Sequence, residues 1–327
     1  MALKKNYVMI IGSSNMDLNI YSERLPNPGE TVTGGTFMHF LGGKGANQSI
    51  ASVRSGSNTV FITKIGQDTF GDKILLQLQK EGVIVDHIIR DPNEPSGIAF
   101  IMINKFGENM ISVAPGANVN LMPNEVRKHS DLIKKANSLV VQMEIPIETI
   151  KEIFSIASKG NVIKMLNPAP LKPIPIDMLK DIDIIIPNEG ELIKLYTLLG
   201  FKELKGRGLE ILSKIARDIT NLGVKNVIIT LGSKGSLIYE SETDKTTMIP
   251  ALKVQAIDTV GAGDCFNGVL ASKLNQGENF ITAVKYATVA ASIAVTRKGA
   301  QESMPYLLEI EEKYKEYEKL HHWGQKL

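Results

Sequence analysis

The sequence is poor in cysteine and carries no excess of charge of either sign. Its one cysteine, Cys265, allows no intramolecular disulfide and no zinc site built from several thiolates, as is typical of a reducing compartment. Lys and Arg number 37 against 35 Asp and Glu, and the formal net charge is +2. No strong positive field is therefore available to attract DNA or anionic lipid. We expect neither a nucleic acid nor a membrane as a partner.

Long hydrophobic runs are also absent near the start of the chain. The first apolar run, residues 7–11, ends at Gly12 and is too short for a signal peptide or a membrane span. With 327 residues, 43% of them hydrophobic, the chain can still bury a large core. No repeat or low-complexity linker divides it. We therefore expect a cytoplasmic protein that forms a single domain over residues 1–327.

Short runs rich in β-branched residues alternate with amphipathic stretches along the whole chain. The predicted strands are residues 8–11, 59–65, 138–143, 162–167, 183–186 and 227–231. Between them, residues 72–82 and 208–222 carry apolar side chains at helical spacing. This alternation is typical of βαβ units and predicts an α/β fold with a mainly parallel sheet.

Two regions, residues 30–40 and 97–113, break this rhythm and resemble antiparallel strands. Within the second, residues 105–109 are typical of a hairpin connection. Residues 98–103 are apolar on both faces of the pleat, so both faces need cover. A small projecting sheet would meet this need by covering a ligand with one face and meeting a partner with the other. The alternative is a central strand of the main sheet.

A glycine-rich segment near the C-terminus, residues 258–264 (DTVGAGD), precedes the predicted start of a helix at residues 265–271. Small residues before a helix let backbone N–H groups approach an anion, and the helix dipole favours negative charge there. Asp264 could then take a proton from a hydroxyl that attacks a phosphoryl group held by these amides. In the alternative interpretation Asp264 is only a helix cap and the glycines form only a tight turn.

Two further loops follow predicted strands. Asn188 and Glu191 could face phosphate and a hydrated Mg²⁺, or could simply cap a helix. Residues 230–235 (TLGSKG) suit either a nucleotide-binding loop or a hairpin. The sequence contains no P-loop motif, and no dinucleotide-binding GxGxxG follows the first strand.

A second group of polar residues lies closer to the N-terminus. It comprises residues 12–17 (GSSNMD), residues 41–48 (LGGKGANQ) and Glu144. Carboxylate, amide and ammonium groups together could bind several hydroxyls of one polyol. Each of these residues could equally be a solvated loop residue or a cap.

Taken together, these motifs resemble the PfkB family of carbohydrate kinases and, within it, the ribokinases. The resemblance runs from Gly12 to about Pro305. Both family signatures are present, at residues 42–47 and 258–264, and the segments that look specifically like ribokinases are 28–32, 42–48, 167–170 and 297–301. The resemblance implies a ribokinase-like three-layer α/β/α domain with a mainly parallel central sheet and a small antiparallel β-sheet lid at residues 30–40 and 97–113.

The resemblance also implies an activity, the transfer of the γ-phosphoryl group of ATP to O5 of D-ribose to give D-ribose 5-phosphate. Asp264 would be the general base, and Gly261, Ala262 and Gly263 would form the anion hole. The sugar would be bound by Asn15, Asp17, Gly43, Lys44, Asn47, Glu144 and Asp264. The nucleotide would be contacted by Asn188, Thr230, Leu231, Gly232, Ser233, Lys234, Gly235, Gly263 and Thr288.

Metal ions and a dimer are implied in the same way. Glu191 would help to hold Mg²⁺, chiefly through water. A K⁺ site beside the anion hole would use, partly through carbonyl oxygens, Asp258, Val260, Ala294, Arg297, Gly299 and Ser303. The lid would pair between the subunits of a homodimer. Cys265 departs from the family, in which Ser, Thr or Ala is more usual, and is either an acidic, oxidisable thiol or a small buried hydrophobe.

Two other functions remain open from the sequence alone. A related kinase for 2-deoxyribose or a nucleoside would keep the same catalytic motifs, because one altered pocket contact can redirect specificity. A sugar-sensing protein without catalysis would not need the intact Asp264, anion hole and Asn188/Glu191 pair.

Overall fold

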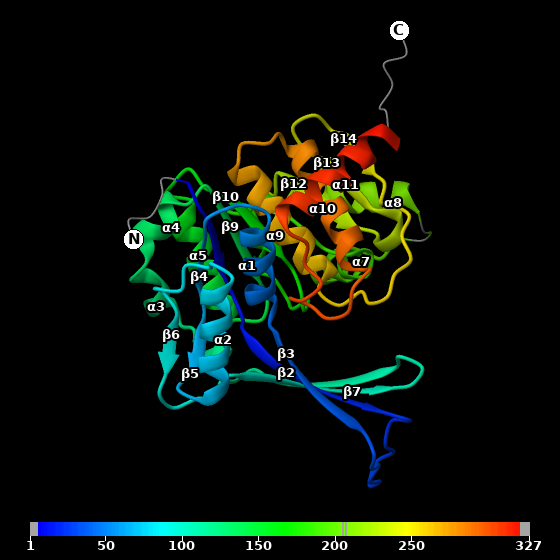
Figure 1. The fold of residues 1–327 in the computed structure, drawn as a ribbon. Helices are drawn as coiled ribbons and strands as arrows, with labels where there is room; N and C mark the ends of the chain where they lie inside the picture. Colours follow the sequence, from blue (N-terminus) through cyan, green and yellow to red (C-terminus); the bar gives the residue numbers. More distant parts are fainter. Residues whose placement is uncertain (1–5, 205, 207, 321–327) are drawn as a thin grey trace.

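The computed structural model describes residues 6–204, 206 and 208–320, and it places helices on both faces of one large sheet (Figure 1). The strands of this sheet are, in spatial order, β14 (Lys245–Ile249), β13 (Ser236–Glu240), β12 (Asn226–Thr230), β11 (Ile184–Ile185), β10 (Ile163–Asn167), β9 (Ser138–Gln142), β1 (Val8–Ile11) and β4 (Thr59–Ile62). Neighbours pair in parallel from β4 to β12, and β13 and β14 are antiparallel. The predicted mainly parallel sheet is confirmed.

Two hydrophobic clusters lie on opposite faces of this sheet, because successive side chains of a strand alternate between its faces. Met9 and Ile11 of β1 belong to one cluster, and Val8 and Ile10 belong to the other. The first cluster is covered by α3 (Pro123–Arg127), α4 (Ser130–Lys135), α5 (Ile147–Ala157), α6 (Ile176–Leu179), α7 (Glu189–Leu198) and α8 (Leu209–Thr220). The second is covered by α1 (Lys44–Arg54), α2 (Thr69–Lys80), α9 (Ala262–Asn275), α10 (Phe280–Ala294) and α11 (Leu307–Leu320). This is the predicted α/β/α layering.

The strand predicted at residues 59–65 is in fact two strands. β4 ends at Ile62, and β5 (Lys64–Gly66) pairs in parallel with β6 (Ile89–Asp91) outside the large sheet. The Lys64 ammonium group lies 3.1 Å from the Asp91 carboxylate. A lysine side chain can be buried on this strand only beside an acidic partner, and pairing of β5 with β6 provides one. Within the described residues, no helix has both the length and the apolar content needed to cross a bilayer.

The lid is a four-stranded sheet that projects below the main body (Figure 1). Its strands are, in spatial order, β3 (Thr36–Gly42), β2 (Asn15–Ser22), β7 (Gly97–Asn104) and β8 (Asn109–Ala114), and a short 3-10 helix, η1 (Gly116–Asn120), follows β8. The structure therefore favours the projecting sheet over a central strand of the main sheet, and residues 105–109 do connect two strands as a hairpin.

Three details of the predicted lid were wrong. The sheet is mixed, not antiparallel, because β2 and β7 run in parallel. Strand β2 was not predicted, although Met16, Leu18 and Ile20 alternate there with polar residues. The predicted strand at residues 30–40 begins only at Thr36, because positive-φ glycines at 29 and 34 interrupt the segment before it.

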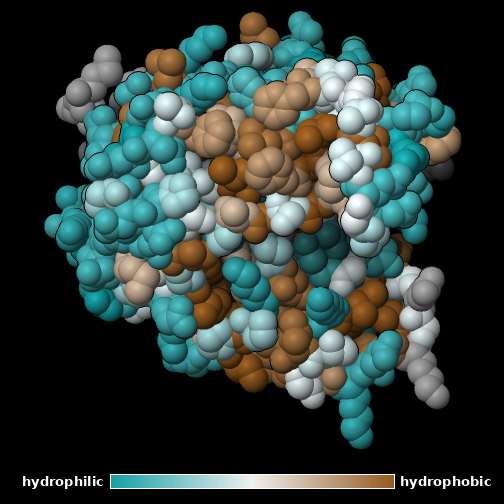
Figure 2. Space-filling model, turned by 90° about the horizontal axis from the view of Figure 1, so that it is seen from below, coloured by the Kyte–Doolittle hydropathy of each residue, from teal (hydrophilic) through white to brown (hydrophobic). Residues whose placement is uncertain are grey.

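The lid leaves much apolar surface exposed. Seen from below, the molecule shows hydrophobic side chains grouped together on this side (Figure 2). Phe100 in β7 is 53% exposed. Other exposed apolar side chains of the lid strands are Ile20, Tyr21, Phe37, Met38, Met110, Ile111 and Val113. The registers place Ile20, Phe37, Phe100 and Met110 on one face of the lid and Tyr21, Met38, Ile111 and Val113 on the other. Exposed apolar groups in this number are typical of an interaction site.

Candidate active site

A cavity of about 210 Å³ opens where several parallel strands end. Asn167 is the last residue of β10, Thr230 is the last of β12, and Asn188 follows β11. In open α/β sheets, ligands bind at this carboxyl-terminal edge. The cavity is lined by Lys44, Asn167, Ala169, Ile186, Asn188, Glu191, Thr230, Thr259, Gly261, Gly263, Asp264 and Asn267. Most of the residues predicted to contact phosphate line this cavity. Of the polar residues at 12–17, 41–48 and 144 that were predicted to bind a polyol, only Lys44 does, and Asn15, Asp17, Gly43, Asn47 and Glu144 are not among the lining residues.

Asp264 lies in the first turn of α9 with its side chain fixed by two amides. Its Oδ2 accepts a hydrogen bond from Nδ2 of Asn47 at 3.0 Å, and its Oδ1 accepts one from Nε2 of Gln48 at 2.9 Å. Asp264 is only 6% exposed. The close approach of α1 and α9 depends on Gly268, where a Cβ would overlap the backbone oxygen of Gln48. The carboxylate is therefore held rigidly at the cavity wall, by α1 rather than by a cap of its own helix.

The start of α9 forms the part of the wall that suits an anion. Gly261 adopts a left-handed φ of 75° and so turns the chain into the helix. A Cβ at Gly263 would meet no atom within 4 Å, so the space beside its backbone is open. Backbone N–H groups at the N-terminus of a 14-residue helix, together with its dipole, favour phosphate here.

Asn188 and Glu191 cap α7 and also line the cavity. Oδ1 of Asn188 accepts from the backbone N of Glu191, and Oε2 of Glu191 accepts from the backbone N of Asn188, both at 2.8 Å. This capping box uses Oε2 and not Oε1 of Glu191. Burial raises the pKa of Glu191 above its usual value. A partly desolvated carboxylate with one oxygen outside the cap suits a hydrated divalent cation. The two predicted roles, cap and ligand, are therefore compatible.

Lys44 carries its positive charge into a group of four carboxylates. The nearby Asp264 is the largest influence that raises its pKa, and Glu144, Glu191 and Asp17 act in the same direction. The ammonium group therefore stays charged despite its burial. Lys44 begins α1, and its backbone N donates to Oε2 of Glu144 at 3.0 Å. The same oxygen accepts from Oγ of Ser13.

Asp17 lies on β2 near these carboxylates. Burial is the main cause that raises its pKa from 3.8 to about 7, and repulsion by Glu144 adds to it. Gly42 pairs with Asn15 across β2 and β3, and a Cβ at Gly42 would overlap the carboxylate of Asp17, the next β2 residue on the same face. Gly43 has a φ of 86°, which a residue with a Cβ rarely adopts. The glycines of the GGKGAN motif are thus required by the turn from β3 into α1.

The predicted nucleotide-binding residues are only partly brought to this cavity. Residues 230–235 form the hairpin between β12 and β13, in which the backbone N of Leu231 donates to O of Gly235 at 2.8 Å. Of this loop, only Thr230 lines the cavity. Thr288 lies buried in α10, where its hydroxyl donates to O of Val284 at 2.9 Å. Thr288 does not line the cavity.

The residues predicted for K⁺ lie in two segments that Asp258 joins. Its Oδ2 accepts from the backbone N of Gly299 and its Oδ1 from that of Val260, both at 3.0 Å. The guanidinium group of Arg297 is paired with the Glu309 carboxylate. The hydroxyl group of Ser303 donates to the backbone oxygen of Ala300 at 2.8 Å. Ala294 is the last residue of α10. Backbone carbonyl oxygens and the remaining lone pairs of the Asp258 carboxylate are therefore the groups that these residues can offer to a cation.

Several residues around the site were not among the predicted site residues. Gln48 links Asp264 to Asn167 and Gln142 through its side-chain amide. Its position in the GGKGANQ motif was a signal that it belongs to the site. Asn118 had no such signal, because its contacts with Ser14 and Asn15 depend on tertiary structure. Asn267 lies one turn beyond the glycine-rich motif, and its amide donates to O of Gly263 in the same helix. Cys265 is fully buried, and burial raises the pKa of its thiol to about 12. It is therefore the small buried hydrophobe of the two alternatives.

The chain is similar to known carbohydrate kinases in both sequence and fold. Residues 5–307 match the profile described as pfkB family carbohydrate kinase. A ribokinase of Staphylococcus aureus (strain COL) is 39% identical over 307 residues, which cover 93% of this chain and 98% of that protein. A deoxyribokinase of Salmonella typhi is 33% identical over 309 residues, covering 93% and 97%. The structure of Arabidopsis thaliana ribokinase complexed with ribose and ATP superposes with a TM-score of 0.88 at 31% identity, covering 95% and 99%.

Proposed function

Since the chain belongs to the pfkB family of carbohydrate kinases, we propose that it transfers the γ-phosphoryl group of ATP to O5 of D-ribose and forms D-ribose 5-phosphate. One observation carries this proposal. Asp264 is fixed between the open N-terminus of α9, which suits a phosphate, and the polar side chains of α1, which suit a sugar. An attacking hydroxyl held there has a base on one side and the phosphoryl group on the other.

In the proposed reaction, the Asp264 carboxylate accepts the proton of the 5-hydroxyl. O5 then bonds to the γ-phosphorus while the bond to the β,γ-bridging oxygen breaks, and ADP leaves with that electron pair. The N–H groups at Gly261, Ala262 and Gly263 would stabilise the negative charge on the transferred group. The amides of Asn47 and Gln48 keep the carboxylate in place, so its position is set before the substrate arrives.

We assign sugar binding to the residues at the lid side of Asp264, namely Asn15, Asp17, Gly43, Lys44, Asn47 and Glu144. The nucleotide would extend from the cavity past Asn188 and Thr230 toward residues 231–235 and Thr288. Glu191 would hold Mg²⁺ through water, and the ion would neutralise the charge of the phosphates. The segments joined by Asp258 would hold K⁺. The kinase would be one domain, with the lid covering the sugar and pairing with the lid of a second copy.

The second candidate is a kinase for 2-deoxyribose, because a deoxyribokinase is 33% identical to this chain. The test is an ATP-coupled assay over pentoses, 2-deoxypentoses, hexoses and nucleosides. We expect the highest kcat/KM for ribose. A preference for 2-deoxyribose or for a nucleoside would refute ribose as the substrate, and absence of transfer to every acceptor would favour a sugar-sensing protein.

A further inference from the structure

All four lid strands join the main body at one place, which we call the lid root (residues 14–15, 42–43, 96–97 and 115–118). At this point Asn15 pairs with Gly42 on one side and with Gly97 on the other. A Cβ at Gly43 would lie 2.6 Å from Cα of Ser14. Segments that are far apart in the sequence are therefore in close contact at the base of the lid in Figure 1.

One side chain, that of Asn118 in η1, hydrogen-bonds to residues 14–15 as well as to its own segment of the lid root. Asn118 is 2% exposed. Its Oδ1 accepts from the backbone N of Ser14 at 2.9 Å, and its Nδ2 lies 3.1 Å from O of Ser14 and 2.9 Å from O of Pro115. Nδ2 also donates to Oδ1 of Asn15 at 2.8 Å. A single buried carboxamide thus ties the end of β8 to the start of β2.

The bond to Asn15 sets the orientation of the Asn15 amide. Because Oδ1 of Asn15 accepts from Asn118, the opposite end of that amide, Nδ2, is the end left to donate to a ligand. Asn15 and Asp17 are two residues apart on β2 and so share a face of the sheet. Gly97 leaves room for this arrangement, because a Cβ there would overlap both Oδ1 of Asn15 and Nδ2 of Asn118.

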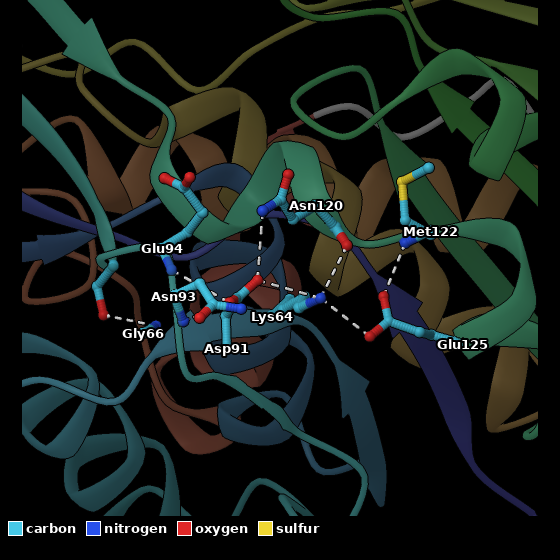
Figure 3. A network of polar contacts seen from close by, with 9 residues as sticks. Lys64, Gly66, Asp91, Asn93, Glu94, Asn120, Met122 and Glu125 are labelled. Carbon is cyan, nitrogen blue, oxygen red and sulfur yellow. Dashed lines mark hydrogen bonds and ion pairs between the residues drawn. The ribbon is translucent and has the colours of Figure 1, made fainter.

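Helix η1 is also fixed from its outer side. Figure 3 shows Lys64 between the backbone oxygen of Asn120 and two carboxylates. Nζ of Lys64 lies 3.0 Å from O of Asn120, 3.1 Å from Asp91 and 3.0 Å from Glu125. Nδ2 of Asn120 donates to Asp91 at 3.3 Å. Because this network holds η1 to the main body, Asn118 can act as a fixed support for Asn15.

We propose that Asn118 is a positioning residue for the sugar: it turns the donor end of Asn15 toward the sugar site and keeps it there. The inference rests on the proposed function, in which Asn15 contacts the sugar. A positioning role differs from a general stabilising role in one respect. If Asn118 positions Asn15, removing Asn118 affects sugar binding only while the Asn15 side chain is present.

The test is a double-mutant cycle with Asn118→Ala and Asn15→Ala, read as KM for ribose and for ATP. Loss of a buried hydrogen bond that orients a ligand-binding group should raise KM for ribose about tenfold in Asn118→Ala. KM for ATP should differ less than about twofold between Asn118→Ala and the wild type. KM for ribose should also differ less than about twofold between the double variant and Asn15→Ala. The matched control, Asn104→Ala, removes an exposed hydrogen bond to Glu108 at the far end of the lid, which neither reaches Asn15 nor holds η1, and it should leave both KM values unchanged.

An equal increase in KM for ribose with and without Asn15 would overturn the inference, since it would show a merely structural role. If Asn118→Ala does not fold, Gly97→Ala replaces it in the cycle, because the added methyl group separates the same two amides. Wild-type protein that phosphorylates no sugar would refute the proposed function itself. Wild-type activity on ribose together with an unchanged KM in Asn118→Ala would refute only the role of Asn118.

Discussion

Replacing Asp17 by Asn should make the folded protein more stable at neutral and alkaline pH while weakening sugar binding. Burial and repulsion by Glu144 raise the pKa of Asp17 from 3.8 to about 7. Between these two pH values the native protein holds a proton that the unfolded chain has lost. The stability of the wild-type protein must therefore fall as the pH rises through this range, and the fall ends above the native pKa.

The size of the effect follows from the shift in pKa. Each unit of difference between the native and unfolded pKa is worth about 1.4 kcal/mol, so a shift of about three units amounts to about 4 kcal/mol at pH 8. Asparagine has the same shape and does not ionise, so Asp17→Asn removes this cost. Its advantage over the wild type should be small near pH 4, grow by about 1.4 kcal/mol per pH unit, and level off above pH 7.

Urea unfolding of both proteins at pH 4, 5, 6, 7 and 8, without sugar or nucleotide, measures this difference. Asp86→Asn, at an exposed position between α2 and β6, serves as the matched control and should show no such trend. A stability difference between Asp17→Asn and the wild type that does not change with pH would refute the reasoning. In the kinase assay the variant should show a raised KM for ribose at pH 8, because the sugar loses an ionised acceptor.

Three further predictions concern the base, the cation and the dimer. Asp264→Asn should lower kcat by about 10²–10⁴, because the amide keeps the shape of the side chain but cannot accept the proton; a kcat above about a tenth of the wild-type value would exclude Asp264 as the base. Activity should rise when K⁺ replaces tetramethylammonium at constant ionic strength and saturating Mg²⁺, and equal rates would remove the site beside Asp258. Light scattering should give about twice the chain mass of 35.8 kDa for the wild type and the single chain mass for Phe100→Asp, whereas a monomeric wild type would exclude pairing of the lids.

The main sheet was predictable from the sequence because its strands are short, β-branched and buried on both faces. Residues 8–11 and 138–143 correspond to β1 and β9 almost to the residue. The break between β4 and β5 was not predictable, because it depends on Asp91, which lies about 30 residues further along the chain. Strand β2 does alternate in polarity, but its polar residues had been interpreted as a ligand-binding loop.

The candidate site was predictable in its residue types but not in their contacts. The motifs indicated Asp264 and Asn47, and the structure adds that Asn47 donates to Asp264 across 217 positions of sequence. The sequence could not decide whether Asn188 and Glu191 cap a helix or bind a ligand. The two residues form a capping box and also line the cavity, so the two roles do not exclude each other. Asn118 belongs to no motif that we recognised, and its contacts with Ser14 and Asn15 exist only in the folded chain.

The charge of the site indicates the form in which ATP binds. Lys44 lies among four carboxylates, those of Asp17, Glu144, Glu191 and Asp264. If all four are ionised, the group carries a formal charge of −3, and free ATP adds further negative charge beside it. Two features would reduce this repulsion: the proton that Asp17 retains up to about pH 7, and the divalent cation that we propose near Glu191. ATP should therefore bind as its Mg²⁺ complex, and a bound cation near Glu191 should in turn lower the pKa of Asp17 by offsetting the charge of its neighbours.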